Sequence, residues 1–251
     1  MVGTIYLDER TMGLLTSGIK SMRVTILQPS YLPWLGFFEQ MHRSDQFVLY
    51  DDVQFTRRDW RNRNRIRVQE GSVWLTVPVI QKNKYEQSLI ETKIDNSTSW
   101  KRKHLESIRC HYSKTPFFDL YFPWCEKTFN REWDFLLDLS LETIQYLKGE
   151  LKINTPLLRS SELGESGNKS ERLISICKQL GATQYLSGES ARNYISEKDF
   201  SDQGIGLEYQ NYQHPEYPQR YEGFVPFLST IDLLFNCGDK SMGFLKQTNF
   251  A

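Results

Sequence analysis

Two short runs of strand-forming residues flank an amphipathic segment near the beginning of the chain, and this pattern constrains the fold more than any other feature. The first run is Arg23-Val-Thr-Ile-Leu27 and the second is Gln46-Phe-Val-Leu-Tyr50. Between them, at residues 34–41, apolar side chains recur every three or four positions, which is typical of a helix with one buried face. A strand, a helix and a strand within about thirty residues match a βαβ unit and predict two parallel strands.

The rest of the chain continues this mixture of elements. Further strands are predicted at 73–79, 184–187 and 206–212, and further helices at 133–147, 171–180 and 227–235, with one more opening near Ser99. We therefore predict an α/β fold with a mostly parallel sheet, flanking helices and a helical insertion near residues 99–150. Because no linker divides the chain, residues 22–251 are expected to form one domain. Residues 1–21 precede the first regular pattern and are expected to be a leader.

Composition excludes several classes of protein. Lys plus Arg and Asp plus Glu each total 31, so the net charge is zero and we expect no nucleic acid partner. No apolar run approaches the roughly 20 residues of a membrane-spanning helix, so no transmembrane segment is expected. The four cysteines lack Cys-x-x-Cys spacing and the four histidines are scattered, which predicts thiols in a reducing cytoplasm and no zinc-type metal site. The absence of Gly-x-Gly-x-x-Gly, Walker and Gly-x-Ser-x-Gly motifs disfavours dinucleotide, P-loop and serine-hydrolase chemistry.

Arginine is concentrated between Gln54 and Arg67, where six of fourteen residues are arginine. A guanidinium group holds phosphate or carboxylate through two parallel hydrogen bonds, and the neighbouring asparagines add donors and acceptors. Since the chain as a whole is neutral, this local patch favours a small phosphorylated ligand over a long polyanion. A solvated basic loop and an RNA site are the alternatives. The candidate binding residues are Trp60, Arg61, Asn62, Arg63, Asn64 and Arg65.

Other candidate residues follow predicted strands. Asp51 and Asp52 end the second predicted strand, where open α/β sheets place their ligands, and can act as a general base or bind Mg²⁺ beside phosphates. The alternative is that they cap the next turn. His214, in the rigid sequence His-Pro-Glu-Tyr-Pro-Gln, is a reserve acid or base. Ser187 and Gly188 lie between a predicted strand and a predicted helix, where backbone N–H groups can meet an anion.

Seven blocks of sequence together resemble one known family. They are Gln28-Pro-Ser-Tyr-Leu-Pro-Trp-Leu-Gly-Phe-Phe, Ser44-Asp-Gln-Phe-Val-Leu-Tyr-Asp-Asp-Val-Gln-Phe55, Trp60-Arg-Asn-Arg-Asn-Arg-Ile, Trp74-Leu-Thr-Val-Pro-Val, Tyr185-Leu-Ser-Gly, His214-Pro-Glu-Tyr-Pro-Gln and Leu228-Ser-Thr-Ile-Asp-Leu-Leu-Phe-Asn-Cys-Gly238. Spread over residues 22–238, these blocks resemble the WbqC-like family. The resemblance implies a place among bacterial O-antigen, lipopolysaccharide and other surface-polysaccharide genes, and the transfer of glycine or another amino acid to a sugar.

The turn after the first strand is also similar in layout to pantothenate synthetase and other nucleotidylyltransferases. Those enzymes bind ATP with a His-x-Gly-His motif in this turn and activate a carboxylate as an adenylate. Here only Gly36 of that pattern is present, and Pro33 and Phe37 occupy the neighbourhood of the histidines.

These resemblances lead to the hypothesis of a cytoplasmic enzyme that joins an amino acid or related acyl group to the amine of a nucleotide-linked amino sugar. Asp51 and Asp52 are the expected catalytic residues, and Gln28, Tyr31 and Trp34 the expected pocket wall. ATP and Mg²⁺ are needed if the acyl group is activated in place, and neither is needed if it arrives on a carrier. The alternatives are nucleotidyl transfer to a sugar phosphate, and a non-catalytic sugar-binding protein whose aromatic residues stack on sugars.

Overall fold

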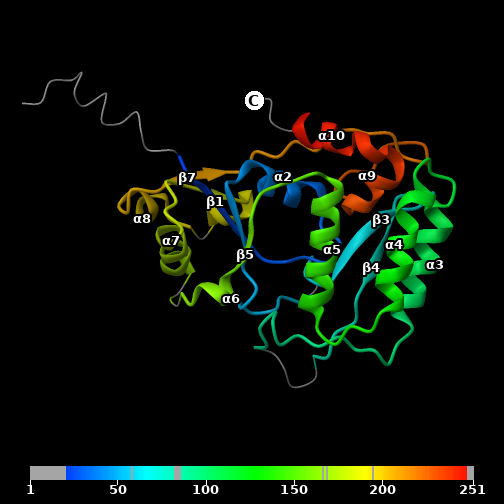
Figure 1. Ribbon diagram of the computed structural model, residues 1–251, viewed down its shortest axis with the longest axis horizontal. Coiled ribbons are helices and arrows are strands. Elements are labelled where there is room, and N and C mark those ends of the chain that lie inside the picture. Colours follow the sequence, from blue (N-terminus) through cyan, green and yellow to red (C-terminus); the bar gives the residue numbers. More distant parts are fainter. Residues whose placement is uncertain are drawn as a thin grey trace, which may run out of the picture.

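The computed structural model describes residues 21–247, apart from 58, 82–85, 166, 168 and 194 (Figure 1). The leader expected at residues 1–21 therefore lies outside the described residues, except for Ser21. In the described part of the chain, five strands form one sheet and two form a separate hairpin.

The main sheet contains only parallel pairs of strands, in the spatial order β5-β2-β1-β6-β7. The bounds are β1 (Arg23–Leu27), β2 (Gln46–Leu49), β5 (Leu157–Arg159), β6 (Gln184–Ser187) and β7 (Gly206–Tyr209). From β1 the chain adds β2 and β5 on one side, and then returns to place β6 and β7 on the other side. The predicted parallel α/β sheet is confirmed, and the strand order reverses between β1 and β6.

Side chains on the two faces of this sheet enter two separate cores, because successive residues of a strand point to opposite sides. Val24 and Val48 belong to a cluster with α7 (Lys169–Gln179). Phe47 belongs to a larger cluster that includes α2 (Leu35–Arg43). Helices therefore cover both faces of the sheet, as is usual for parallel sheets.

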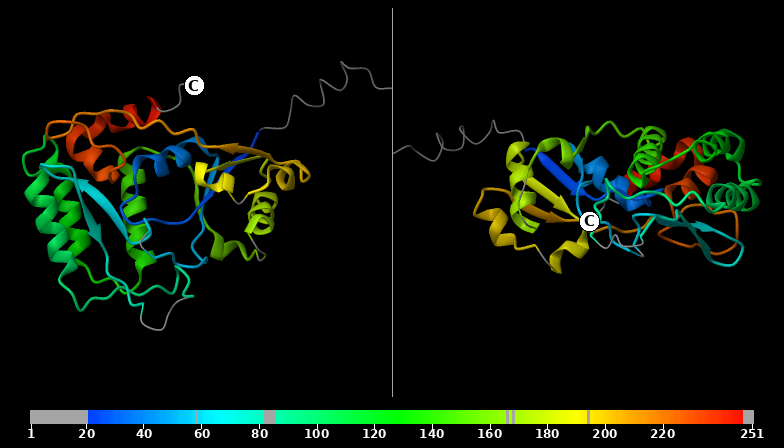
Figure 2. Two further views of the ribbon diagram at one scale, coloured as in Figure 1. Left: turned by 180° about the vertical axis from the view of Figure 1, so that it is seen from behind. Right: turned by 90° about the horizontal axis from the view of Figure 1, so that it is seen from below.

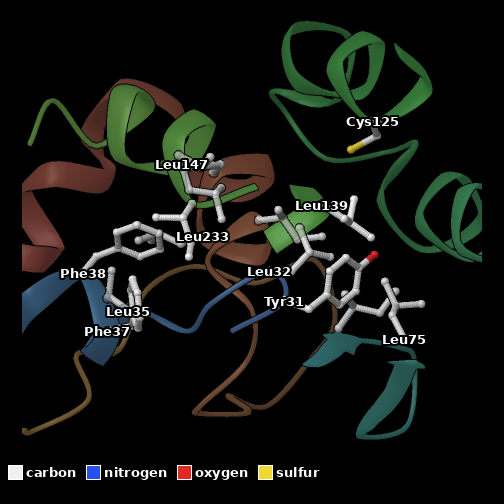
Figure 3. Packing of buried hydrophobic residues seen from close by; sticks show 14 of the residues in the cluster. Tyr31, Leu32, Leu35, Phe37, Phe38, Leu75, Cys125, Leu139, Leu147 and Leu233 are labelled. Atoms are coloured by element: carbon white, nitrogen blue, oxygen red, sulfur yellow. The ribbon is translucent and has the colours of Figure 1, made fainter. Parts of the chain in front are cut away.

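The larger core continues into a second region, built from the hairpin and three helices. The bounds are β3 (Arg63–Arg67), β4 (Ser72–Thr76), α3 (Trp100–Tyr112), α4 (Phe118–Asn130) and α5 (Leu136–Glu150). The three helices occupy the region 99–150 that was predicted to hold a helical insertion. In Figures 1 and 2, α3 and α4 lie at the opposite end of the molecule from α7. Figure 3 shows how this core joins the turn after β1 to β4 and to α5.

The remaining elements are short. They are α6 (Ser160–Leu163), η1 (Glu189–Asn193), α8 (Glu197–Ser201), α9 (Thr230–Cys237), η2 (Gly238–Lys240) and α10 (Ser241–Gln247). The helix predicted at 227–235 begins later because Ser229 caps it, its Oγ accepting from the N–H of Ile231, and because Phe227 has a left-handed φ of 58°. Among the described helices, none has both the length and the apolarity needed to cross a bilayer.

Candidate functional site

A cavity of about 490 Å³ lies outside the carboxyl ends of three neighbouring strands. Its wall contains Leu27 at the end of β1, Gly188 directly after β6 and Gln210 directly after β7. Open parallel sheets bind ligands in the crevice where the strand order reverses, which here is between β1 and β6. The volume is in the range of small-molecule sites. This cavity, named the β1–β6 cavity below, is therefore the candidate site.

Aromatic side chains form one side of the β1–β6 cavity. The rings of Trp34 and Tyr212 meet edge to face with centroids 4.9 Å apart, and the Phe227 ring lies 5.7 Å from Trp34. Gly36 permits this arrangement, because a Cβ atom at that position would overlap the Trp34 indole. Such a wall can stack against a base or a sugar ring.

Arg61 joins the basic segment to the turn after β1. Its Nη1 donates to the carbonyl oxygen of Gln28 at 2.9 Å and to Oγ of Ser30 at 3.2 Å, and its Nε pairs with Asp59 at 3.3 Å. Arg61 and Trp60 both line the cavity. Of the predicted pocket residues, Gln28 thus contributes a backbone carbonyl group that holds Arg61 in place.

The continuation of the basic segment is strand β3, so it is not a solvated loop. Asn62, just before the strand, and Asn64 are buried. Their Nδ2 atoms donate to the carbonyl oxygens of Val77 at 2.7 Å and Leu32 at 2.6 Å. These two predicted binding residues therefore connect β3 to its neighbours.

Arg63 and Arg65 lie on the other face of β3, beside two tryptophans. The ring centroids of Trp60 and Trp74 are 5.2 Å apart, and the Arg63 guanidinium carbon lies 4.2 Å from the Trp74 ring. The guanidinium carbon of Arg65 lies 5.7 Å from Trp60 and 5.6 Å from Trp74. These two arginines and two tryptophans together form the arginine and tryptophan face. Because Trp60 also lines the cavity, this face adjoins the cavity wall.

The same stretch of the chain matches a known family. The model of the WbqC-like protein family matches residues 28–243, which include the turn after β1, the basic segment and the ends of β6 and β7. The chain belongs to the WbqC-like family. Among curated proteins, it is 37% identical over 226 residues to an uncharacterized protein, Rv1507c, of Mycobacterium tuberculosis (strain ATCC 25618 / H37Rv). The alignment covers 89% of this chain and 97% of that protein. No solved structure matches the chain.

Two residues predicted for the site of this WbqC-like protein lie in its interior. Tyr31 is fully buried in the core (Figure 3), and its hydroxyl group is 2.9 Å from Nδ1 of His104. Ser187 is also buried, with its Oγ 3.4 Å from the hydroxyl group of Tyr185. The next residue, Gly188, lines the cavity.

Asp51 follows β2 and is fully buried in a cluster of donors. Its Oδ2 accepts from Nε of Arg159 at 2.6 Å and from Oγ of Ser161 at 2.9 Å, and its Oδ1 accepts from the N–H of Ser161 at 3.0 Å. These bonds join the end of β2 to the beginning of α6.

Asp52 completes this cluster. It accepts from Oγ of Ser160 at 2.6 Å and from Nη2 of Arg172 at 2.5 Å. Burial raises the pKa of Asp52, but the hydrogen bonds from Arg172 and Ser160 outweigh burial and hold the pKa below its usual value. The two carboxylates therefore lie after β2, the strand next to β1, and neither of them is among the residues that line the cavity.

His214 lies one layer behind the aromatic wall. Its ring centroid is 5.1 Å from Phe227 and 5.7 Å from Tyr212. Nδ1 is 3.0 Å from the carbonyl oxygen of Pro215, which can only accept, so Nδ1 carries the proton and Nε2 keeps its lone pair. Among the described residues Nε2 has no hydrogen-bond partner, and burial lowers the pKa of the imidazole. This neutral form is suited to act as a base.

The sequence analysis missed Gln40 of α2 and Gln210 at the end of β7. Both are buried and both line the cavity. Gln40 stands three residues after Phe37, within the apolar stripe of α2. A polar residue at a position where the helix pattern requires an apolar one is the signal that could have identified it.

Proposed function

We propose that this protein is an enzyme of bacterial surface-polysaccharide biosynthesis that acts in the cytoplasm on a nucleotide-linked amino sugar. It transfers an amino acid such as glycine, or a related acyl group, to the amine of that sugar. The observation that carries the proposal is the β1–β6 cavity, which lies at the reversal of strand order and has an aromatic wall. Membership of the WbqC-like family supports the choice of substrate, because the resemblance implies a role among surface-polysaccharide genes.

The two parts of such a ligand suit two kinds of surface. Trp34 and Tyr212 in the wall offer faces for a sugar or a base to stack on. The diphosphate requires positive charge, and Arg65 supplies a guanidinium group whose carbon lies 5.7 Å from the ring of Trp60, a residue that lines the cavity. Arg61 is held by the turn after β1 and so positions Trp60 next to it.

Amide formation requires a base near the sugar amine. The amine nitrogen bonds to the acyl carbon, the bond from that carbon to its leaving group breaks, and one proton leaves the nitrogen. We assign this proton to Nε2 of His214, since this atom keeps its lone pair. Because the ring packs behind Phe227 and Tyr212 of the wall, the assignment requires these side chains to move so that Nε2 meets the amine.

Asp51 and Asp52 are the second proposal for the base, or for binding Mg²⁺ with ATP. Their carboxylates already accept hydrogen bonds from Arg159 and Arg172, and these positive charges oppose a second cation at the same place. The donor set does not suit Mg²⁺, so no step is routed through it, and an acyl group delivered on a carrier is the simpler route.

The experiment is a turnover assay with purified protein. UDP- and dTDP-linked amino sugars are incubated with acyl carriers, or with free amino acids, ATP and Mg²⁺, and the amide product is identified by mass spectrometry. His214→Gln is expected to lower turnover at least about 100-fold while ligand affinity stays within about threefold. Asp52→Asn tests the rival base in the same assay. Wild-type turnover by His214→Gln would remove His214 from the mechanism.

The strand order also favours nucleotidyl transfer to a sugar phosphate. The turn Gln28-Pro29 follows β1 at the reversal point, the place where the nucleotidylyltransferases that this layout resembles bind ATP. Release of pyrophosphate without an amide product would support this reaction. Tight binding of a nucleotide sugar with no product from any donor would support the sugar-binding alternative.

A further inference from the structure

The hairpin of β3 and β4 has one edge that the fold completes and one that it leaves open. On the β3 side, the carbonyl oxygen of Arg65 accepts a hydrogen bond from the N–H of Ser229 at 2.9 Å. On the other side, β4 pairs only with β3 in the described part of the chain. An open strand edge presents N–H and C=O groups that can pair with another extended chain.

The register of the hairpin determines which groups of β4 point outward. The N–H of Val77 donates to the carbonyl oxygen of Asn62 at 2.8 Å, so Val77 is directed toward β3. In an antiparallel pair this direction alternates along the strand, so the main-chain groups of Thr76 and Trp74 are directed away from β3. In agreement, the carbonyl oxygen of Thr76 accepts from Nε2 of His104 on α3 at 3.2 Å. The N–H and C=O groups of Trp74 therefore lie at the open edge.

A cavity of about 430 Å³, named the β4–α3 groove below, lies between this strand and α3. Trp74 and Thr76 line it from β4, and Lys103, His104 and Ser107 line it from α3. In Figure 1, β4 and α3 lie at the same end of the molecule. An extended peptide in such a groove forms main-chain hydrogen bonds with the strand, and its alternate side chains point to the same side.

β4 lacks the features that usually protect an edge strand from pairing. Its sequence, Ser72-Val-Trp-Leu-Thr76, contains no charged residue and no proline. Val73 is 39% exposed and Trp74 is 40% exposed. An added strand would cover part of both side chains, so burial of apolar surface would stabilise the pairing in addition to the main-chain hydrogen bonds.

The charge around the groove favours an acidic partner. Together α3, β3 and β4 contain seven Lys or Arg residues and one acidic residue, Glu106, although the whole chain is neutral. Lys103 lines the groove, and Arg63 and Arg65 lie beside the Trp74 ring. A second copy of the chain would bring a second set of these cations to the same edge, which opposes self-association there.

We propose that the β4–α3 groove binds an extended acidic segment of a partner protein, which adds a strand to the open edge of β4. The main chain of this segment pairs with the N–H and C=O groups of Trp74, and its carboxylates contact Lys103. A nucleic acid would supply negative charge, but not the alternation of donors and acceptors that a strand edge requires. The described residues that line this groove include none that lines the β1–β6 cavity, so the inference does not depend on the proposed function.

The test uses an array of eight-residue peptides and the fluorescently labelled full-length protein. Apolar residues alternate with acidic residues in one set of peptides and with basic residues in a second set. We expect the acidic set to bind and the basic set not to bind. The tightest acidic peptide is then labelled with fluorescein, and its Kd is measured by fluorescence anisotropy.

Trp74→Pro and Trp74→Ala form the decisive pair of variants. Both remove the indole ring, but only proline also removes the outward N–H group, which does not bond to β3. We expect Trp74→Pro to bind the acidic peptide at least about tenfold more weakly than Trp74→Ala does. Thermal unfolding checks that both variants are folded.

Lys103→Glu tests the charge without altering the strand, and it decides the question if Trp74→Pro does not fold. It should weaken binding of the acidic peptide at least about fivefold. The matched control is Arg102→Glu, because Arg102 is on the same helix but does not line the groove, and its Kd should change less than about twofold.

Three results would overturn the inference. The first is that no acidic peptide binds to the wild-type protein. The second is that neither matched pair of variants differs in Kd. The third is that a single-stranded RNA oligonucleotide binds more tightly than the peptide and is affected equally by Trp74→Pro and Trp74→Ala, which would indicate phosphate recognition by the arginine and tryptophan face instead.

Discussion

Two neighbouring strand ends of the same sheet carry polar groups, and they differ in whether those groups already have partners. After β2, the carboxylates of Asp51 and Asp52 accept hydrogen bonds from Arg159 and Arg172. Beside the ends of β1, β6 and β7 there is instead a cavity of about 490 Å³, lined by Gln40, whose Oε1 has no partner among the described residues. The first arrangement connects segments of the fold, and the second leaves open space for a ligand.

The comparison teaches that charge at a strand end is weaker support for a ligand site than an open volume, because the charged groups at this strand end are already paired within the fold. The predictions below separate the two arrangements by asking which changes affect stability and which affect binding.

The largest expected effect is on stability, from Asp51→Ala. Removing a fully buried carboxylate leaves Arg159 and the donors of Ser161 without their partner, which should lower the free energy of unfolding by about 3–5 kcal/mol. Asp52→Ala is the matched control, and should cost about 1 kcal/mol because the Asp52 side chain is 25% exposed. Urea unfolding at pH 7 measures both. A loss of UDP-glucosamine affinity with unchanged stability in Asp51→Ala would place the strand end in the site.

A third polar cluster, around Asp232 of α9, is fully bonded but includes no hydrogen bond from a cation among the described residues. Asp232 accepts from the hydroxyl groups of Tyr112 at 2.7 Å and Tyr217 at 2.9 Å, and from Nε2 of Gln219 at 3.0 Å. Burial raises its pKa to about 6, although the hydrogen bonds oppose the shift. Tyr217 and Gln219 belong to the segment between β7 and α9 that also carries Tyr212 of the cavity wall.

This raised pKa predicts a pH dependence of stability. The folded state holds the Asp232 proton more tightly than the unfolded state, in which the pKa is about 3.9, so the contribution is present below pH 4 and is lost as the pH rises through 6. Two pKa units correspond to about 3 kcal/mol. The unfolded-state group is about half ionised at pH 4, so the stability advantage of the wild type over Asp232→Asn should shrink by about 2 kcal/mol between pH 4 and pH 7, as measured by urea unfolding. A difference that is the same at both pH values would contradict the prediction.

Local sequence patterns predicted most strands of the parallel sheet. They failed where charge or short length obscured the pattern of a strand. β1 and β6 are compact runs followed by turn residues, and both were predicted with their observed bounds. β3 was not predicted because its arginines were weighed by charge, although the alternation of Arg and Asn has the period of two that is typical of a strand. β5 has only three residues, Leu157–Arg159, too few for a periodic signal.

The candidate site was predictable only in part, for a physical reason. Trp34, Trp60 and Gly188 follow or precede recognisable elements, and all three line the cavity. Gln40 and Gln210 are separated by 170 positions, and only the return of the chain across β1 brings them together. The pattern of residues within one segment does not determine the order of the strands in the sheet. A contact between residues so far apart in the sequence therefore could not be predicted from either segment alone.

The smallest expected effect separates the cavity from the arginine and tryptophan face next to it. Trp60 lines the cavity, whereas Trp74, with its ring centroid 5.2 Å away, lies on β4 and is 40% exposed. Stacking of one base on an aromatic side chain contributes about 1–3 kcal/mol, so Trp60→Ala should weaken UDP-glucosamine binding about tenfold. The control Trp74→Ala should change the Kd less than about threefold, because it removes only the support behind Trp60.

The relative order of these two effects decides where the ligand lies. If Trp74→Ala causes the larger loss, the ligand binds across β3 and β4, where Arg63 and Arg65 lie beside Trp74, and the cavity is not its site. If Trp60→Ala causes the larger loss, the ligand stacks on the tryptophan that lines the β1–β6 cavity, and the cavity is its site.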